Sequence, residues 1–349
     1  MIMTATVHRK LMFALLPALA LGLAGLAAPL QAETLKMSNW VPTTHYLYTD
    51  VFTPWAEDVE KVTEGRVKVN ILPKALGTPP QHWELARKGI ADITWGNFTY
   101  EPDRFQSIWF AEFPSSGRDA KAQSLALWNS YNQYLQADKA YAGVKVLSVG
   151  MFGGGQMHHG SRDMVELSDI AGQKFRMGGP IQQVLIESLG GVPVSAPATK
   201  AYEMLESKVI DGSLHTLESV VNFRLQDVLT HHTVFGQGLY DATFFLIMNE
   251  KKWNRLSPED QAAIEKVSGA AFATRWGEAF NRQNAAAEQS LRDAGHTFSE
   301  PSPELVARVA EIRTQMVADW EVAAKEKGIA DPKALLADFE ADYKSLEGR

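Results

Sequence analysis

Short apolar segments alternate along most of this chain with longer segments in which apolar residues recur every three or four positions. Residues 66–72 give the clearest short segment, because Val67, Val69 and Ile71 alternate with polar residues, as in a strand with one buried face. Further strands are predicted at 35–39, 90–95, 144–149, 174–177, 192–195, 209–213 and 244–248. Strands that alternate with helices predict an α/β protein with two sheets or one large sheet.

Helices are predicted between these strands and in the C-terminal part of the chain. Trp55 and Val59 belong to a series at helical spacing, and Thr49 or Asp50 can cap its start. The other helical segments between strands are 81–88, 120–135, 181–189 and 200–207. The Ser-Pro pair at 257–258 is a strong start signal, because Pro favours the first helical position after a Ser cap. From there onward the chain is predicted to be almost entirely helical.

The first 32 residues have the pattern of an export signal. His8, Arg9 and Lys10 precede an apolar run from 11 to 30, and the small residue Ala32 stands before an acidic one. An uncleaved membrane anchor is the alternative, since about 20 apolar residues can span a bilayer. The Pro and Gly residues inside the run disfavour that anchor. We predict a signal peptide over 1–32 that is cleaved on export, with the exact cleavage site open.

The composition excludes several kinds of site and partner. The chain has no Cys, which rules out a disulfide framework, a Cys nucleophile and thiolate ligands for zinc or iron–sulfur clusters. Its formal net charge is −7 and it has no basic stripe, whereas a nucleic-acid-binding protein needs a basic face for the phosphates. We therefore expect no nucleic-acid partner.

Clusters of glycine and histidine are present, but they lack the spacing that catalysis or metal binding needs. The glycines at 153–155 follow a predicted strand without a phosphate-binding motif, so a hinge is the favoured interpretation. The His-His pairs at 158–159 and 231–232 cannot chelate a metal alone, because neighbouring residues of a strand point to opposite faces. The chain also lacks a G-x-S-x-G elbow. These patterns predict neither a metal site nor a cofactor.

Arg176 lies in an otherwise apolar, strand-like segment, 174–177, which the Gly-Gly-Pro sequence at 178–180 ends. A guanidinium held at a strand end beside exposed glycine backbone suits the two-bond capture of a carboxylate. An ordinary structural ion pair is the alternative interpretation. From the residues alone, both stay open.

Several segments taken together resemble one group of exported proteins. The stretches SLGGVPV (188–194), AYEML (201–205) and KVIDG (208–212) are similar to the patterns LGxxPV, xxYxAL and GxVDG. The stretch SDIAGQKFR (168–176) is similar to D-L-x-G-x-K-x-R. These are patterns of the solute-binding proteins of tripartite ATP-independent periplasmic (TRAP) transporters, the DctP-like family. The resemblance runs from about residue 35 to 265.

The resemblance implies a ligand pocket, residue by residue. The Arg that clamps the ligand carboxylate in this family falls on Arg176, and the place of a second Arg, common in relatives, falls on Gln156. The other expected pocket residues are Asn97, Trp95, Trp40, His215 and Phe152. With one permanent positive charge, such a pocket would leave a second carboxylate unpaired. We therefore predict a monocarboxylate with hydroxyl, oxo or ring substituents, unless His215 supplies a second charge below about pH 6.5.

The resemblance also implies the fold and the function. The fold would be a two-lobed α/β periplasmic binding protein, of the Venus-flytrap type, with crossing strands and long C-terminal helices. Lobe one would contain 33–153 with 242–281, and lobe two 154–241 with 282–349. The lobes would close over a small organic acid and deliver it to the small and large permease subunits of a TRAP transporter. This role makes no bond and breaks none, so we predict that the protein is not an enzyme.

Two other functions stay open on the sequence. An exported lyase, isomerase or hydrolase could use His158, His215 and Glu218 as acid and base around a carboxylate held by Arg176. A ligand-sensing subunit of a signalling receptor is the other alternative. The sequence names neither the ligand nor the oligomeric state, and it leaves open whether a cation assists binding.

Overall fold

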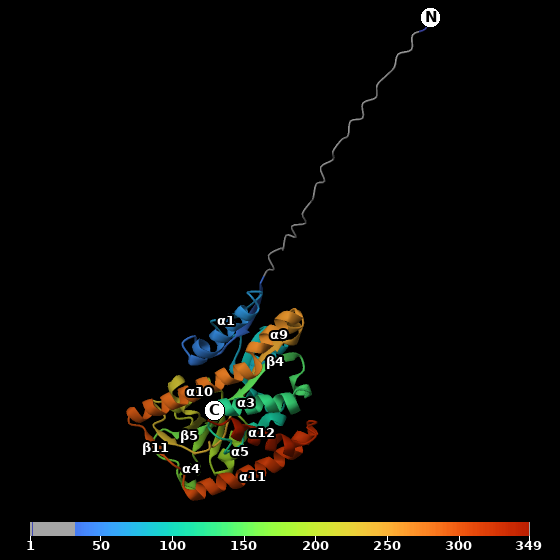
Figure 1. Cartoon of the computed structure of the whole chain (residues 1–349). Coiled ribbons are helices and arrows are strands. Elements are labelled where there is room, and N and C mark those ends of the chain that lie inside the picture. Colours follow the sequence, from blue (N-terminus) through green and yellow to red (C-terminus); the bar gives the residue numbers. More distant parts are fainter. Residues whose placement is uncertain (1, 3–31, 349) are drawn as a thin grey trace. The chain divides into compact units, whose positions relative to one another are not determined.

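The computed structural model describes residue 2 and residues 32–348 (Figure 1). The predicted signal peptide, 1–32, lies outside the described residues except for residues 2 and 32. No helix in the described part of the chain is both long and apolar enough to cross a membrane. Within residues 32–348 the strands form two sheets.

The first sheet is built around a fully buried strand. Its strands, in spatial order, are β2 (Val67–Ile71), β1 (Glu33–Ser38), β3 (Ile93–Asn97), β10 (Thr243–Asn249) and β4 (Val144–Met151). β1 pairs in parallel with β2 and β3, whereas β10 runs antiparallel to β3 and β4. Every residue of β10 is buried, which explains its uninterrupted apolar sequence.

The second sheet contains shorter strands. In spatial order they are β11 (Thr297–Ser299), β9 (His231–Thr233), β5 (Gln156–His159), β8 (Gly212–His215), β6 (Lys174–Met177) and β7 (Val192–Ser195). β5 runs antiparallel to β8 and β9, and β6 pairs in parallel with β7 and β8. The parallel pairing brings the carboxyl ends of β6 and β8 to the same edge of this sheet.

Two segments of the chain cross side by side between the sheets. One is 152–155, between β4 and β5, and the other is 234–242, between β9 and β10. The backbone N–H of Gly155 donates to the Tyr240 carbonyl at 2.7 Å, and a Cβ at 155 would lie 2.1 Å from the Tyr240 ring. The glycine is therefore required by a close approach. The Asp241 carboxylate also accepts a hydrogen bond from the Gly154 N–H at 3.0 Å. A hinge at 153–155 stays a prediction.

Helices pack on both sheets. Those in the half of the chain that builds the first sheet are α1 (Thr53–Val62), α2 (His82–Arg87), α3 (Ala120–Ser130), α8 (Glu250–Trp253) and α9 (Pro258–Val267). Those among the strands of the second sheet are α4 (Leu167–Ile170), α5 (Pro180–Ser188), α6 (Ala201–Glu206) and α7 (Leu217–Asn222). Shorter helical turns are η1 (Leu47–Phe52), η2 (Pro79–Gln81), η3 (Phe98–Tyr100), η4 (Gln106–Glu112), η5 (Tyr131–Leu135), η6 (Lys139–Tyr141) and η7 (Ala198–Lys200).

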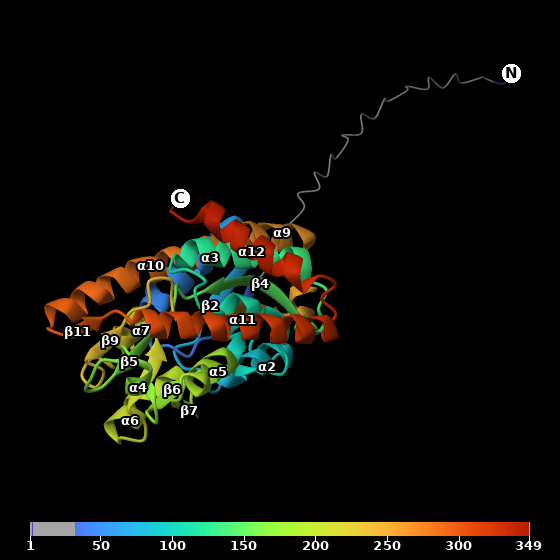
Figure 2. The ribbon, with the colours of Figure 1, turned by 90° about the horizontal axis from the view of Figure 1, so that it is seen from below.

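Three long helices follow: α10 (Gly269–Asp293), α11 (Pro303–Glu326) and α12 (Pro332–Leu346). α10 contacts α3 and β4 and also α7, so it joins elements of both sheets. Its Trp276 stacks on Phe244 of β10 in the core beneath the first sheet. Figure 2 shows α11 running between α12 and α5. Because α12 packs on α3 and α11 contacts both η4 and α5, the C-terminal helices touch elements of both predicted lobes. The division into lobes stays a prediction.

The structure confirms the α/β class and most of the predicted elements. Strands β6 and β7 have the predicted bounds, and the Ser257 side chain caps α9 by accepting from the Asp260 N–H. The predicted cap at Thr49 or Asp50 is wrong, because the helical turn η1 already begins at Leu47 and contains both residues. The prediction also lacked β5, β9 and β11, which have only three or four residues each.

Candidate functional site

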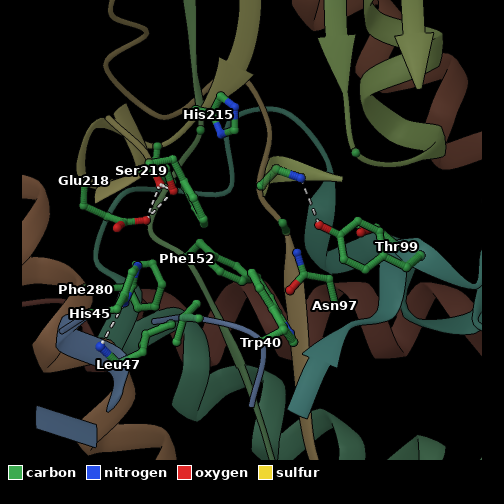
Figure 3. Close-up of a pocket in the computed structure, with 18 of the residues that line it drawn as sticks. Trp40, His45, Leu47, Asn97, Thr99, Phe152, His215, Glu218, Ser219 and Phe280 are labelled. Carbon is green, nitrogen blue, oxygen red and sulfur yellow. Dashed lines mark hydrogen bonds between the residues drawn. The ribbon is translucent and has the colours of Figure 1, made fainter. Parts of the chain in front are cut away.

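A cavity lies where the crossing segments meet the edges of the two sheets (Figure 3). Its volume, for the centre of a water-sized sphere, is about 60 Å³. The predicted site residues on its wall are Trp40, Trp95, Asn97, Phe152, Arg176 and His215. They come from the loop after β1, from β3, from the first crossing segment, from β6 and from β8. The cavity therefore brings together residues that are distant in the sequence.

Arg176 is buried in this wall, with 4% of its surface exposed. Its Nε donates to the Ala196 carbonyl at 2.8 Å, and its Nη1 donates to the Leu214 carbonyl at 3.2 Å. No acidic side chain among residues 32–348 forms an ion pair with it. Burial lowers the pKa of Arg176, but a guanidinium stays protonated in proteins. Arg176 is thus a buried cation on the cavity wall without an ion-pair partner in the described part of the chain, an arrangement that favours an anionic ligand.

The two glycines after β6 leave space for neighbouring side chains, Gly178 for the Arg176 guanidinium and Gly179 for Thr99. A Cβ at Gly178 would lie 3.0 Å from Nη2 of Arg176. A Cβ at Gly179 would lie 2.6 Å from Cβ of Thr99, which belongs to η3 on the other side of the cavity. The Gly-Gly sequence is therefore explained by two close approaches, one of them to the predicted anchor.

Aromatic rings form another part of the wall. Trp40 and Trp95 stack with their centroids 4.2 Å apart, and the Trp95 Nε1 donates to Asn39 at 2.9 Å. Phe152 meets Phe280 of α10 edge to face at 4.8 Å. Figure 3 shows the rings of Trp40 and Phe152 near the centre of the view, and both residues line the cavity. Such a surface can cover the faces of a flat apolar ring.

Several buried polar atoms of the wall have no hydrogen-bond partner within residues 32–348. They are Trp40 Nε1, His45 Nε2, the Tyr46 hydroxyl, Asn97 Oδ1 and His215 Nε2. Buried polar groups in native proteins are normally paired, and an unpaired one costs about 1–3 kcal/mol. Their gathering around one cavity indicates that a polar ligand completes their hydrogen bonds.

His215 is neutral in this setting. Burial lowers its pKa well below the ordinary value, and the charge of Arg176 lowers it further. His45, on the same wall, has a pKa lowered to about 4 by burial. Neither imidazole adds a positive charge to the cavity at neutral pH.

The structure places Gln156 outside the cavity lining. The Gln156 Oε1 accepts from the Phe235 N–H at 2.7 Å, and its Nε2 faces the Phe235 carbonyl at 3.4 Å. The side chain therefore fastens β5 to the second crossing segment. His158 also lies outside the lining, because its ring nitrogens bind His232 at 2.8 Å and the His215 carbonyl at 3.1 Å.

The sequence interpretation missed several wall residues. They are His45, Tyr46, Tyr100, Tyr240 and Phe280, with Glu218 named only as a candidate acid or base. Tyr240 packs directly against Gly155, so this glycine indicates the close approach of a large side chain as well as the predicted hinge. No motif marks the other residues.

Comparison with known proteins gives a consistent result. Residues 37–325 match the family described as bacterial extracellular solute-binding protein, family 7 (DctP). A TRAP periplasmic solute-binding protein from Bordetella bronchiseptica, solved with (R)- and (S)-mandelate, is 35% identical with a TM-score of 0.87, over 90% of this chain and 99% of that one. A marine metagenome TRAP solute-binding protein specific for aromatic acid ligands, solved with 3-hydroxybenzoate, is 27% identical with a TM-score of 0.83 and the same coverage. Among curated proteins, the outer membrane transporter protein TsaT of Comamonas testosteroni is 25% identical over 89% of this chain and 92% of its own length.

Proposed function

Because the chain belongs to family 7 of the bacterial extracellular solute-binding proteins, we propose that it is the receptor of a TRAP transporter for a small aromatic monocarboxylate. The single observation that carries this proposal is the buried Arg176, which has no acidic partner among residues 32–348. Two of its five N–H groups are used on carbonyls and the Tyr100 side chain also interacts with the guanidinium, which still leaves N–H groups for a ligand carboxylate. A charge-assisted, two-bond contact of this kind is both strong and specific for a carboxylate.

The aromatic wall supports a ring in the ligand. The stacked Trp40 and Trp95, together with Phe152 and Phe280, offer flat apolar surface beside Arg176. The small cavity volume favours one ring over two. Mandelate and 3-hydroxybenzoate, found in the two related structures, are aromatic monocarboxylates.

The charges of the wall support a single carboxylate. Gln156 does not reach the cavity, and His215 is neutral, so neither supplies a second charge or a second clamp. Glu218, which is 2% exposed, adds an acidic group to the same wall. A second ligand carboxylate would be desolvated without a countercharge, which is expensive.

We propose that the receptor makes no bond in its ligand and delivers it to the small and large permease subunits in the membrane. The enzyme alternative needs His158, His215 and Glu218 around the ligand, but both ring nitrogens of His158 are occupied outside the cavity. We also propose that the protein needs no cofactor or metal. We propose further that the signal segment 1–32 directs it to the periplasm and is then cleaved.

The test is to identify the ligand that copurifies with the protein by mass spectrometry and to measure affinities by calorimetry. Benzoate, phenylacetate, mandelate and the hydroxybenzoates are compared with succinate, malate and fumarate. We expect stoichiometric binding of at least one aromatic acid, without turnover. Binding of the C4-dicarboxylates alone, or conversion of a bound acid to product, would overturn the proposal.

A further inference from the structure

The cavity wall contains a second ionisable group, an acidic one, whose presence the binding of a carboxylate does not explain. Glu218, in the first turn of α7, is 2% exposed and forms no ion pair within the described residues. It accepts hydrogen bonds from the hydroxyls of Thr216 at 2.9 Å and Ser219 at 2.5 Å, and from the Asn222 amide at 3.2 Å. These donors hold an acidic group beside a site that must receive an anion.

The proton on His45 can be assigned from its hydrogen bonds. The Leu47 N–H donates to His45 Nδ1 at 3.1 Å, so Nδ1 carries the lone pair. In the neutral imidazole the proton is therefore on Nε2, which then acts as a donor. This Nε2 is buried and has no partner in the described part of the chain.

Glu218 and His45 belong to the same side of the cavity. Figure 3 shows both on the side opposite Asn97 and Thr99. Phe223 at the end of α7 contacts the His45 ring at 5.9 Å. The hydroxyl of Tyr46, which follows His45, lies close enough to Glu218 that the carboxylate raises the pKa of this phenol, after burial as the larger cause.

An acceptor and a donor on the same side of the cavity match a hydroxyl group, which donates one hydrogen bond and accepts others. A carboxylate in the same place would face Glu218 with like charge, and a C–H group would leave the His45 Nε2–H unpaired. We propose that Glu218 and His45 select ligands whose ring carries a hydroxyl group and reject those with a second carboxylate. This inference rests on the proposed function, because it requires an aromatic acid held by Arg176.

The test uses benzoate, 3-hydroxybenzoate, 4-hydroxybenzoate and isophthalate, with calorimetry on the wild-type protein and on Glu218→Gln. The wild type is expected to bind one hydroxybenzoate about tenfold to a hundredfold more tightly than benzoate, as for a hydrogen bond to a charged group. In Glu218→Gln this preference should shrink by about tenfold, while isophthalate should bind more tightly than to the wild type.

A control for the loss of a buried, hydrogen-bonded carboxyl group is Glu112→Gln. Glu112 is buried, accepts from the Thr243 hydroxyl at 2.5 Å, has a pKa raised to about 8 by burial, and does not line the cavity. This variant should keep the wild-type ratio of affinities. A general loss of structure would weaken all four ligands, whereas the proposed role predicts opposite changes for hydroxybenzoate and isophthalate.

His45→Phe provides an independent variant should Glu218→Gln fold poorly, and it should also lower the preference for the hydroxylated acid. A wild-type protein that binds benzoate as tightly as both hydroxybenzoates overturns this inference and leaves the proposed function standing. Failure of all aromatic acids to bind overturns the proposed function itself.

Discussion

Two groups of buried polar side chains meet at His215, and they differ in how completely they are hydrogen bonded. In the second sheet, His158 binds His232 at 2.8 Å and His232 binds His296 at 2.9 Å. The other ring nitrogen of His158 binds the His215 carbonyl at 3.1 Å. In the cavity, by contrast, the Nε2 atoms of His45 and His215 have no partner among residues 32–348.

The chain of histidines has one consistent assignment of protons. Since the His215 carbonyl only accepts, His158 donates from Nε2 and accepts at Nδ1. His232 then donates from Nδ1 and accepts at Nε2 from His296. This chain is complete without a ligand, so it is part of the structure, whereas the cavity is complete only with one.

The largest expected effect concerns the cavity and its buried Arg176. Arg176→Ala should remove ligand binding, because a carboxylate left unpaired in a buried site loses about 2–5 kcal/mol, or roughly thirty-fold or more in affinity. Arg176→Lys should fail as well, since an ammonium cannot reproduce the planar two-bond fork. Calorimetry with the best aromatic acid measures the loss.

The control for this prediction is Arg308→Ala, which removes an exposed Arg on α11 far from the cavity lining and should leave affinity unchanged. The melting temperature of ligand-free Arg176→Ala should stay close to that of the wild type, because the variant also removes an uncompensated buried charge. Full affinity of this variant would show that the anchor lies elsewhere.

The next effect concerns the hydrogen-bonded histidines His158, His232 and His296 and the pH dependence of the free energy of unfolding. Burial lowers the pKa of His158 to about 4 and that of His232 to about 2, against 6.5 for the ordinary value. In the folded protein these rings stay neutral while the unfolded chain takes up protons. Stability is therefore fully present above about pH 6.5 and falls as the pH drops towards 4, by up to about 1.4 kcal/mol per pH unit for each histidine.

Unfolding in urea at a series of pH values measures this slope. His232→Phe, which places a ring beside Phe298, should give a smaller slope between pH 6.5 and 4 than the wild type. Besides burial, the nearby charges that lower the pKa of His232 are those of His158, His296, His231 and Arg292. His231→Gln removes only one smaller contribution to that pKa, so it is the control and should change the slope less than His232→Phe. Equal slopes in all three proteins would exclude the histidine chain as the cause.

A smaller effect is expected at Gln156. The sequence predicts a contact with the ligand, whereas in the structure its side chain is already hydrogen bonded to the Phe235 backbone. Gln156→Met should leave ligand affinity within about twofold, because the side chain does not line the cavity. It should lower the free energy of unfolding by about 1–3 kcal/mol, since the Phe235 N–H loses its acceptor. A large loss of affinity with unchanged stability would place Gln156 in the site.

The sequence predicts the parts of this protein that local patterns control. Alternation and apolar runs identify strands such as β10, and the Ser-Pro pair identifies the start of α9. Strands β9 and β5 escape prediction because they are rich in histidine and, unlike the four-residue strands β6 and β7, contain at most one apolar residue. They are strands through pairing with β8 and β11, which is a tertiary property.

The site follows the same rule. Arg176 is predictable because a charged residue in an apolar strand before two glycines is locally conspicuous. The structure gives Gln156 another partner, the Phe235 backbone, which is 79 positions away and belongs to a crossing segment that no pattern places. His45 reaches the wall because the chain turns into η1 earlier than its caps suggest. Long-range contacts therefore decide which polar residues remain free for a ligand.

The smallest expected effect concerns the pH dependence of ligand preference, and it tests whether His215, on the cavity wall, is neutral. A protonated His215 would give the cavity a second positive charge at low pH and would attract dicarboxylates. Burial and the charge of Arg176 both lower the pKa of His215 well below its ordinary value, so the imidazole stays neutral at pH 5.5 as well as at pH 8. The ratio of benzoate to isophthalate affinity, measured by calorimetry at both pH values, should therefore change by the same factor, within about twofold, in the wild type and in His215→Asn, which keeps a neutral polar side chain. Burial raises the pKa of Glu218 on the same wall, and any change that its protonation causes is common to both proteins. A ratio that shifts towards isophthalate at pH 5.5 in the wild type but not in this variant would mean that His215 is protonated when the ligand binds, and that burial in the cavity is weaker than the ligand-free structure indicates.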